Sequence, residues 1–114
     1  MERRAGGGQL IRPMLYGARH PVALLAAGEP TADRSWTISG PICEAGDVLA
    51  REIELGPEAG EGALLLIGEA GAYGLAMAMN YNGRLRPAQA VIERRKLRLS
   101  SRRETLTDLV AREV

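Results

Sequence analysis

The adjacent residues Cys43 and Glu44 are the first candidates for chemistry, and they lie in the segment G-P-I-C-E-A-G-D of residues 40–47. A thiol acts as a nucleophile when it is ionised, or donates a proton to a carbanion when it is not. The neighbouring carboxylates of Glu44 and Asp47 favour the protonated thiol, so the local charge indicates a proton donor. The alternative for a lone cysteine is a buried and inert side chain.

Arg12 and Tyr16 are four residues apart and are candidates for binding a carboxylate. The guanidinium of an arginine presents a planar pair of donors that matches a carboxylate in shape and charge. The alternative is a surface ion pair beside a packed aromatic ring. His20 is the only histidine and precedes Pro21, so we expect a structural role for it rather than a role as a metal ligand.

Tyr73 lies among glycines at positions 68, 71 and 74. Glycines permit a close approach of the backbone to a ligand, and free amides together with a hydroxyl can hold an anion such as phosphate. The spacing is neither that of a P-loop nor that of a dinucleotide-binding fingerprint. A tight structural turn is therefore an equal alternative.

The composition restricts the class of protein. The chain has 114 residues, with 15 basic and 14 acidic side chains, which allows one small domain. A net charge of +1 indicates neither nucleic acid nor a membrane as partner. The single cysteine excludes an intramolecular disulfide and fits a reducing cytoplasm. Residues 84–114 are basic, but no aromatic residue lies there to stack on a base, so a small RNA-binding β-barrel is a weaker alternative.

Short apolar or alternating runs, separated by glycine and proline, predict the strands that position these residues. The expected strands cover residues 22–27, 35–39, 47–55, 63–67, 89–92 and 96–99. The run 63–67 is apolar at every position, so we expect it to be buried on both faces. In the last strand, Leu97 and Leu99 are expected to point inward while Lys96 and Arg98 face water.

The end of the sequence predicts a helix. Ser101 and Glu104 fit a capping box, in which each side chain binds the backbone amide of the other residue. The apolar residues that follow at helical spacing are Leu106, Leu109 and Val110. We therefore expect a terminal helix of about two to three turns.

These elements predict a mainly β fold. We expect an antiparallel, Greek-key-like β-barrel or sandwich over residues 10–114, with a short C-terminal helix. Residues 1–9 are expected to form a flexible leader, because the glycines at positions 6, 7 and 8 have no side chains to pack.

Four segments, taken in order, resemble the C-terminal part of the diaminopimelate decarboxylases. They read R-P-x-L-Y-G-A-x-H-P, G-P-x-C-E-x-x-D, G-x-A-G-A-Y-G and N-Y-N-G-R-x-R-P. The closing R-R-E-T-x-x-D-L-V is similar to the last helix of that family, so the resemblance covers roughly residues 10–112. The family depends on pyridoxal phosphate, has the alanine-racemase-like fold type and also contains ornithine and arginine decarboxylases.

The resemblance implies a two-domain enzyme that converts meso-2,6-diaminopimelate to L-lysine and CO2 in lysine biosynthesis. It implies an N-terminal (β/α)8 barrel that holds pyridoxal 5′-phosphate on a lysine, and a C-terminal β domain that closes the site in a homodimer. This chain is similar to the second domain only. Its single lysine, Lys96, lies among arginines and away from every motif, which makes it a poor candidate for holding the cofactor.

The resemblance also implies a role for each candidate residue. Cys43 is similar to the proton donor, and Glu44 is similar to the residue that binds the distal end of the substrate. Arg12 and Tyr16 resemble groups that grip a substrate carboxylate. Tyr73 resembles a tyrosine that reaches both cofactor and substrate. No metal, nucleic acid or membrane is implied as a partner.

A second interpretation is a non-catalytic module. A β domain of this kind can bind the barrel of a full-length decarboxylase and regulate it without contributing to the reaction. The sequence leaves open which interpretation holds, and whether the chain folds without a partner.

Overall fold

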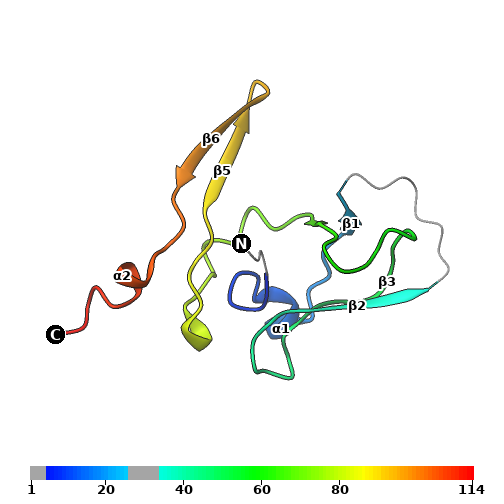
Figure 1. Cartoon of the computed structure of the whole chain (residues 1–114), viewed down its shortest axis with the longest axis horizontal. Helices are drawn as coiled ribbons and strands as arrows, with labels where there is room; N and C mark the ends of the chain where they lie inside the picture. Colours follow the sequence, from blue (N-terminus) through cyan, green and yellow to red (C-terminus); the bar gives the residue numbers. More distant parts are fainter. Residues whose placement is uncertain (1–4, 26–33) are drawn as a thin grey trace.

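The computed structural model describes residues 5–25 and 34–114. Three two-stranded antiparallel sheets form most of the regular structure (Figure 1). They pair β1 (Val22–Leu24) with β4 (Leu65–Ile67), β2 (Ser35–Ser39) with β3 (Val48–Glu54), and β5 (Gln89–Glu93) with β6 (Lys96–Ser101). The prediction of a mainly β fold is confirmed. Within the described residues the sheets stay separate and do not close into a barrel.

The β2–β3 sheet follows the alternation in its sequence. Trp36 and Ile38 are half-buried while their neighbours are exposed, as expected for a strand with one covered face. Trp36 is paired with Ile53 but Ile38 with Ala50, so β3 carries one extra residue between these pairs. Glu52, in this bulge, has a φ of 54°. Bulges of this kind increase the local twist of a strand.

The apolar run 63–67 is not buried on both faces, so that expectation is wrong. The regular strand β4 is three residues long, Leu65 and Leu66 are exposed, and Ile67 is half-buried. Its partner β1 covers one edge, and no other strand among the described residues pairs with the second edge. The strand expected at residues 22–27 begins as predicted, and residues 26 and 27 lie outside the described residues.

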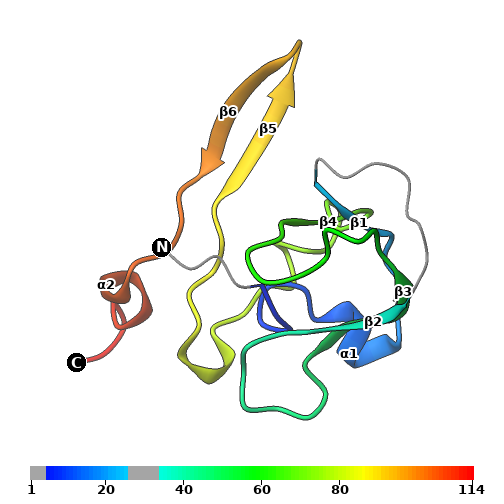
Figure 2. The same cartoon turned by 45° about the vertical axis from the view of Figure 1, so that its right-hand side comes forward.

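The β5–β6 hairpin projects from the rest of the chain (Figures 1 and 2). Arg94 and Arg95 form its two-residue turn with φ angles of 48° and 63°, as a type I′ turn requires. Leu97 and Leu99 are 74% and 59% exposed, so the prediction that they point inward is wrong. The hairpin makes a two-stranded sheet by itself, and within residues 5–25 and 34–114 both leucines stay largely uncovered.

Short helices complete the chain. α1 (Arg12–Tyr16), which the sequence analysis missed, has Pro13 in its first turn and ends at Gly17. Gly17 has a φ of 63°, which suits the left-handed end of a helix. The 3-10 turn η1 (Tyr81–Gly83) lies between β4 and β5.

The terminal helix α2 (Leu106–Leu109) is present but shorter than predicted, because it makes a single turn of four residues. Its capping box is Thr105 with Asp108, not Ser101 with Glu104. The Thr105 hydroxyl accepts from the Asp108 amide, and the Asp108 carboxylate accepts from the Thr105 amide. The helix therefore begins four residues later than the sequence indicated.

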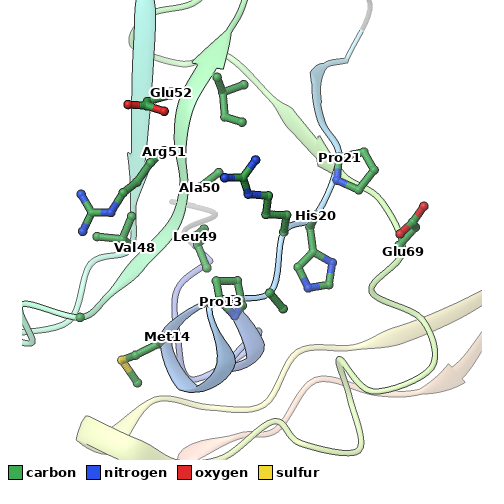
Figure 3. A pocket seen from close by; sticks show the side chains of 15 residues that line it. Pro13, Met14, His20, Pro21, Val48, Leu49, Ala50, Arg51, Glu52 and Glu69 are labelled. Carbon is green, nitrogen blue, oxygen red and sulfur yellow. The ribbon is translucent and has the colours of Figure 1, made fainter.

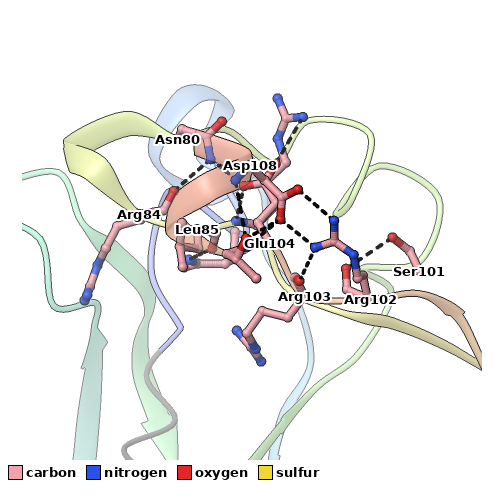
Figure 4. A network of polar contacts seen from close by, with 11 residues as sticks. Asn80, Arg84, Leu85, Ser101, Arg102, Arg103, Glu104 and Asp108 are labelled. Carbon is pink, nitrogen blue, oxygen red and sulfur yellow. Dashed lines mark hydrogen bonds and ion pairs between the residues drawn. The ribbon is translucent and has the colours of Figure 1, made fainter. Parts of the chain in front are cut away.

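Glu104 is used instead to attach the tail to the segment before β5 (Figure 4). Its carboxylate accepts from the Asn80 side chain at 2.6 Å and from the Arg86 amide at 2.8 Å. These two donors lower the pKa of Glu104. Arg102 donates two hydrogen bonds to Asp108, at 2.5 and 2.7 Å, which hold the pKa of Asp108 well below its usual range.

A small core lies around α1 and β3. Its buried apolar side chains are Leu10, Ile11, Leu49, Leu55 and Ala78. The glycines at positions 6–8 are also buried, so the described part of the expected leader is packed. Their lack of side chains is what permits this packing, because a Cβ on Gly6 would lie 2.9 Å from a carboxylate oxygen of Asp47.

We predict that the tail attachment weakens in acid. Glu104 and Asp108 have lowered pKa values in the fold, so their stabilisation is present above about pH 4.5 and is lost as the pH falls through the lowered values. Urea unfolding at a series of pH values, followed through the NMR signals of the Arg86 and Thr105 amides, measures it. In Glu104→Gln/Asp108→Asn this pH dependence should disappear, whereas it should persist in the exposed control Glu61→Gln. Its persistence in the double variant would contradict the assignment.

Candidate functional site

The loop of residues 40–47 is shaped by the buried carboxylate of Asp47, which is 3% exposed. One carboxylate oxygen accepts from the Gly7 amide at 2.6 Å, and the other accepts from the Ile42 amide at 2.9 Å. The Gly40 amide donates to the Asp47 carbonyl at 2.8 Å, which closes the loop. A side chain at Gly40 would clash with the same carboxylate. Asp47 therefore joins the two ends of the loop to the N-terminal glycines.

Cys43 and Glu44 lie at the exposed tip of this loop. The alternative of a buried, inert cysteine is therefore excluded for this structure. The Glu44 carboxylate accepts from the Gly46 amide at 3.4 Å with one oxygen and from the Tyr81 hydroxyl at 3.3 Å with the other. The thiol and the carboxylate are thus presented together on a loop with a fixed base.

Arg12 and Tyr73 are brought together although they are 61 positions apart in sequence. The Arg12 guanidinium lies 5.1 Å from the centre of the Tyr73 ring, a distance suited to a cation–π contact. Tyr16, at the end of α1, is 66% exposed. The contact described for Arg12 is thus an aromatic face rather than the surface ion pair of the alternative, and carboxylate binding by Arg12 and Tyr16 stays a prediction.

α1 also packs on the loop that carries Cys43. A Cβ on Gly46 would lie 3.1 Å from the Sδ of Met14, so the helix and the loop are in close contact. A Cβ on Gly7 would lie 3.5 Å from the methyl carbon of the same methionine. Met14 therefore lies between the helix that carries Arg12 and the loop that carries Cys43 and Glu44.

The glycine-rich segment after β4 behaves as a tight turn. The Gly74 amide donates to the Ala70 carbonyl at 2.7 Å, and the Met77 amide donates to the Tyr73 carbonyl at 2.9 Å. A Cβ on Gly74 would lie 2.5 Å from the Ala70 oxygen, which requires glycine there. These amides are used within the turn, so the structural alternative is favoured over a phosphate cradle. The turn leaves the Tyr73 side chain 55% exposed.

His20 has the structural position expected of it. It is 5% exposed, and its Nδ1 lies 3.0 Å from the Gly68 carbonyl oxygen. Because a carbonyl only accepts, Nδ1 is the protonated nitrogen, and Nε2 has no hydrogen-bond partner among the residues that the structure describes. An open cavity of about 830 Å³ lies beside this histidine, between α1 and β3 (Figure 3). None of the five candidate residues lines it.

Over the described ranges, no cluster of three or more histidine, cysteine or carboxylate side chains could hold a metal ion. No helix in the described part of the chain has both the length and the apolar content to cross a membrane.

Asp47 and Tyr81 are the residues that sequence reasoning did not assign to the site. Both belong to segments that the analysis singled out, G-P-x-C-E-x-x-D and N-Y-N-G-R-x-R-P. The signal for Asp47 was its position beside glycines, which leave space for a buried carboxylate. Asp47 binds Gly7 from 40 positions away and Tyr81 binds Glu44 from 37 positions away, so local spacing could not identify these contacts.

Comparison with protein families identifies the class of domain. Residues 4–71 match the model of the pyridoxal-dependent decarboxylase C-terminal sheet domain. The chain belongs to this family. The match includes the segments that carry Arg12, Cys43 and Glu44 and ends before Tyr73.

Curated and solved relatives agree with this assignment. The diaminopimelate decarboxylase of Deinococcus radiodurans is 46% identical over 110 residues, which are 96% of this chain and 28% of that protein. The crystal structure of the M. jannaschii diaminopimelate decarboxylase superposes with a TM-score of 0.89 at 34% identity, covering 97% of this chain and 25% of that chain. The Helicobacter pylori enzyme, solved with L-lysine, gives 0.83 at 33% identity, covering 95% and 26%. The chain spans about a quarter of the length of these relatives.

We predict that Asp47→Asn lowers the free energy of unfolding of this domain by about 1–3 kcal/mol. The NH2 group of the new side chain would replace one carboxylate oxygen and would face a buried backbone N–H that then has no acceptor. Urea unfolding followed by Trp36 fluorescence measures the free energy of unfolding. Glu61→Gln removes an exposed carboxylate in a neighbouring loop and serves as the control. A loss below about 0.5 kcal/mol in Asp47→Asn, equal to an ordinary surface change, would contradict the anchoring role.

Proposed function

We propose that this chain completes the active site of a diaminopimelate decarboxylase by closing it over pyridoxal phosphate held on a barrel domain. The observation that carries the proposal is the exposed Cys43–Glu44 pair on a loop whose base is fixed by buried Asp47. Exposure at the tip and fixation at the base suit a thiol and a carboxylate that act on a molecule held elsewhere.

Each candidate residue has a chemical task in this proposal. The Sγ–H of Cys43 gives its proton to the carbon that has lost CO2. Glu44 binds the distal ammonium of the substrate, while Arg12 and Tyr16 bind the distal carboxylate. Tyr73 contacts both the cofactor and the substrate with its exposed hydroxyl. Pyridoxal phosphate, when bound, supplies the electron sink that stabilises the carbanion.

The described residues do not provide a complete cofactor site, which supports a separate barrel as the partner. Lys96 is exposed at the tip of the β5–β6 hairpin, and the amides of Gly74 and Met77 donate within the glycine-rich turn. Exposed apolar side chains on β4 and β6 also suit burial against a partner. The largest exposed fractions on these strands belong to Leu66, Leu97 and Leu99. A homodimer of the assembled enzyme follows from the family resemblance.

The net reaction needs no oxidant. The bond between the α carbon and its carboxyl carbon breaks, CO2 leaves, and one proton replaces it on the α carbon. L-lysine is the product when the substrate is meso-2,6-diaminopimelate. Glu44 and Arg12 together favour a substrate that carries both an amino group and a carboxylate at its far end.

The second candidate function is regulation of a full-length decarboxylase by a non-catalytic copy of this domain. The exposed apolar strands support this function as well, since they can bind the barrel of another protein in the same way. It differs from the first proposal in one respect: Cys43 would take no part in the reaction.

The experiment joins residues 1–114 to the barrel part of the Deinococcus radiodurans relative and measures CO2 and lysine formation. We expect decarboxylation in the assembled protein and a loss of about 100-fold or more in kcat in Cys43→Ala, the range for removal of a general acid. Glu61→Gln is the matched control and should retain activity. Unchanged kcat in Cys43→Ala would contradict the proton-donor role. Inhibition of the full-length relative by the added chain, without activity in the joined protein, would favour the regulatory function.

A further inference from the structure

The Glu44 carboxylate is bound on both of its oxygens, although it lies at the surface. The Gly46 amide donates to Oε1, and the Tyr81 hydroxyl donates to Oε2. The first contact is two residues away and belongs to the loop itself, whereas the second comes from a distant segment. An exposed glutamate without such contacts samples several rotamers, and ordering it costs free energy when a ligand binds.

Tyr81 is itself held in place by a well-connected segment. The Asn80 side chain donates to the Arg84 carbonyl at 3.0 Å, and this bond joins the two residues that flank η1. The same side chain donates to Glu104 at 2.6 Å. Upstream, the Met79 amide donates to the Gly8 carbonyl at 2.9 Å. The segment is therefore tied to the N-terminal glycines on one side. On the other side it is tied to the C-terminal tail through Glu104 (Figure 4).

The chemistry of the donor matters. A phenol hydroxyl is neutral, so it orients the carboxylate without cancelling its charge, as a lysine or arginine would. A carboxylate offers about four lone-pair positions, and the Gly46 and Tyr81 bonds use one on each oxygen. The remaining positions and the full negative charge stay available for an ammonium group.

We infer that Tyr81 is a positioning residue that pre-orients Glu44 for a substrate with a distal ammonium group. This inference rests on the proposed function and deepens it, because it makes Tyr81 a determinant of selectivity. It also gives a task to the N-Y-N-G-R-x-R-P segment, to which no role has so far been assigned.

The kinetic test uses the protein joined to the relative's barrel, with Tyr81→Phe as the variant. Loss of one hydrogen bond to a charged group at an exposed site should raise KM for meso-2,6-diaminopimelate about three- to tenfold, with kcat changed less than about twofold. The inhibition constant of 2-aminopimelate, which keeps the distal carboxylate but lacks the distal amino group, should not change. A merely structural defect would weaken both molecules together.

Two further variants test whether Tyr81 acts through Glu44. In Glu44→Gln, the additional change Tyr81→Phe should raise KM by less than about twofold, because the positioned charge is already gone. Asn82→Gly is the matched control: Asn82 has a φ of 59°, which glycine adopts freely, so the turn and the neighbouring hydroxyl are kept. An equal rise in KM for meso-2,6-diaminopimelate and for the 2-aminopimelate inhibition constant, or full additivity of the two substitutions, would overturn the inference.

A measurement on the 114-residue chain separates the contact from the activity. The side-chain carboxyl carbon of Glu44, assigned by the loss of its NMR signal in Glu44→Gln, should shift in Tyr81→Phe and stay in place in Asn82→Gly. An unshifted signal in Tyr81→Phe would overturn the contact and the inference. A shifted signal with no decarboxylation by the joined wild-type protein would refute the proposed function, and the selectivity role with it, while the contact itself would stand.

Discussion

The pair of hydrogen bonds to the buried Asp47 carboxylate is the constraint on which the site depends. It connects the amides of Gly7 and Ile42, which belong to segments on either side of α1 and β2. A buried carboxylate is stable only when donors surround it, so the glycines that allow the backbone to approach are as necessary as the acid itself. Cys43 and Glu44 owe their fixed presentation to this arrangement, although neither touches Asp47 by its side chain in the contacts described.

A second set of contacts extends this frame to the end of the chain. Glu104 binds the segment that carries Tyr81, and Tyr81 binds Glu44. The C-terminal tail is therefore connected to the candidate site through the segment that carries Tyr81. Because the pKa of Glu104 is lowered by its donors, this connection is strongest when that carboxylate is ionised.

The sequence predicted the strands well where local pattern decides them, and failed where distant partners do. β2 was predicted to the residue, because the alternation at residues 35–39 ends at Gly40 and Pro41. Ser101 with Glu104 was the wrong capping pair because Glu104 binds residues 18 and 24 positions away. The exposure of Leu97 depends on which layers surround the hairpin, and local periodicity does not determine that. The five candidate residues could be named from their chemistry and spacing, and their roles from the family motifs, whereas the contact of Arg12 with Tyr73 needs the fold.

The projecting β5–β6 hairpin has a consequence for how copies of the chain meet in solution. Neither of its outer edges pairs with another described strand, and such edges are templates on which another strand can add. Its basic side chains are Arg94 and Arg95 in the turn, and Lys96 and Arg98 on β6. Their mutual repulsion opposes edge-to-edge stacking of two hairpins, and salt screens that repulsion. Contact between two hairpin edges is therefore expected to be easier at high ionic strength than at low.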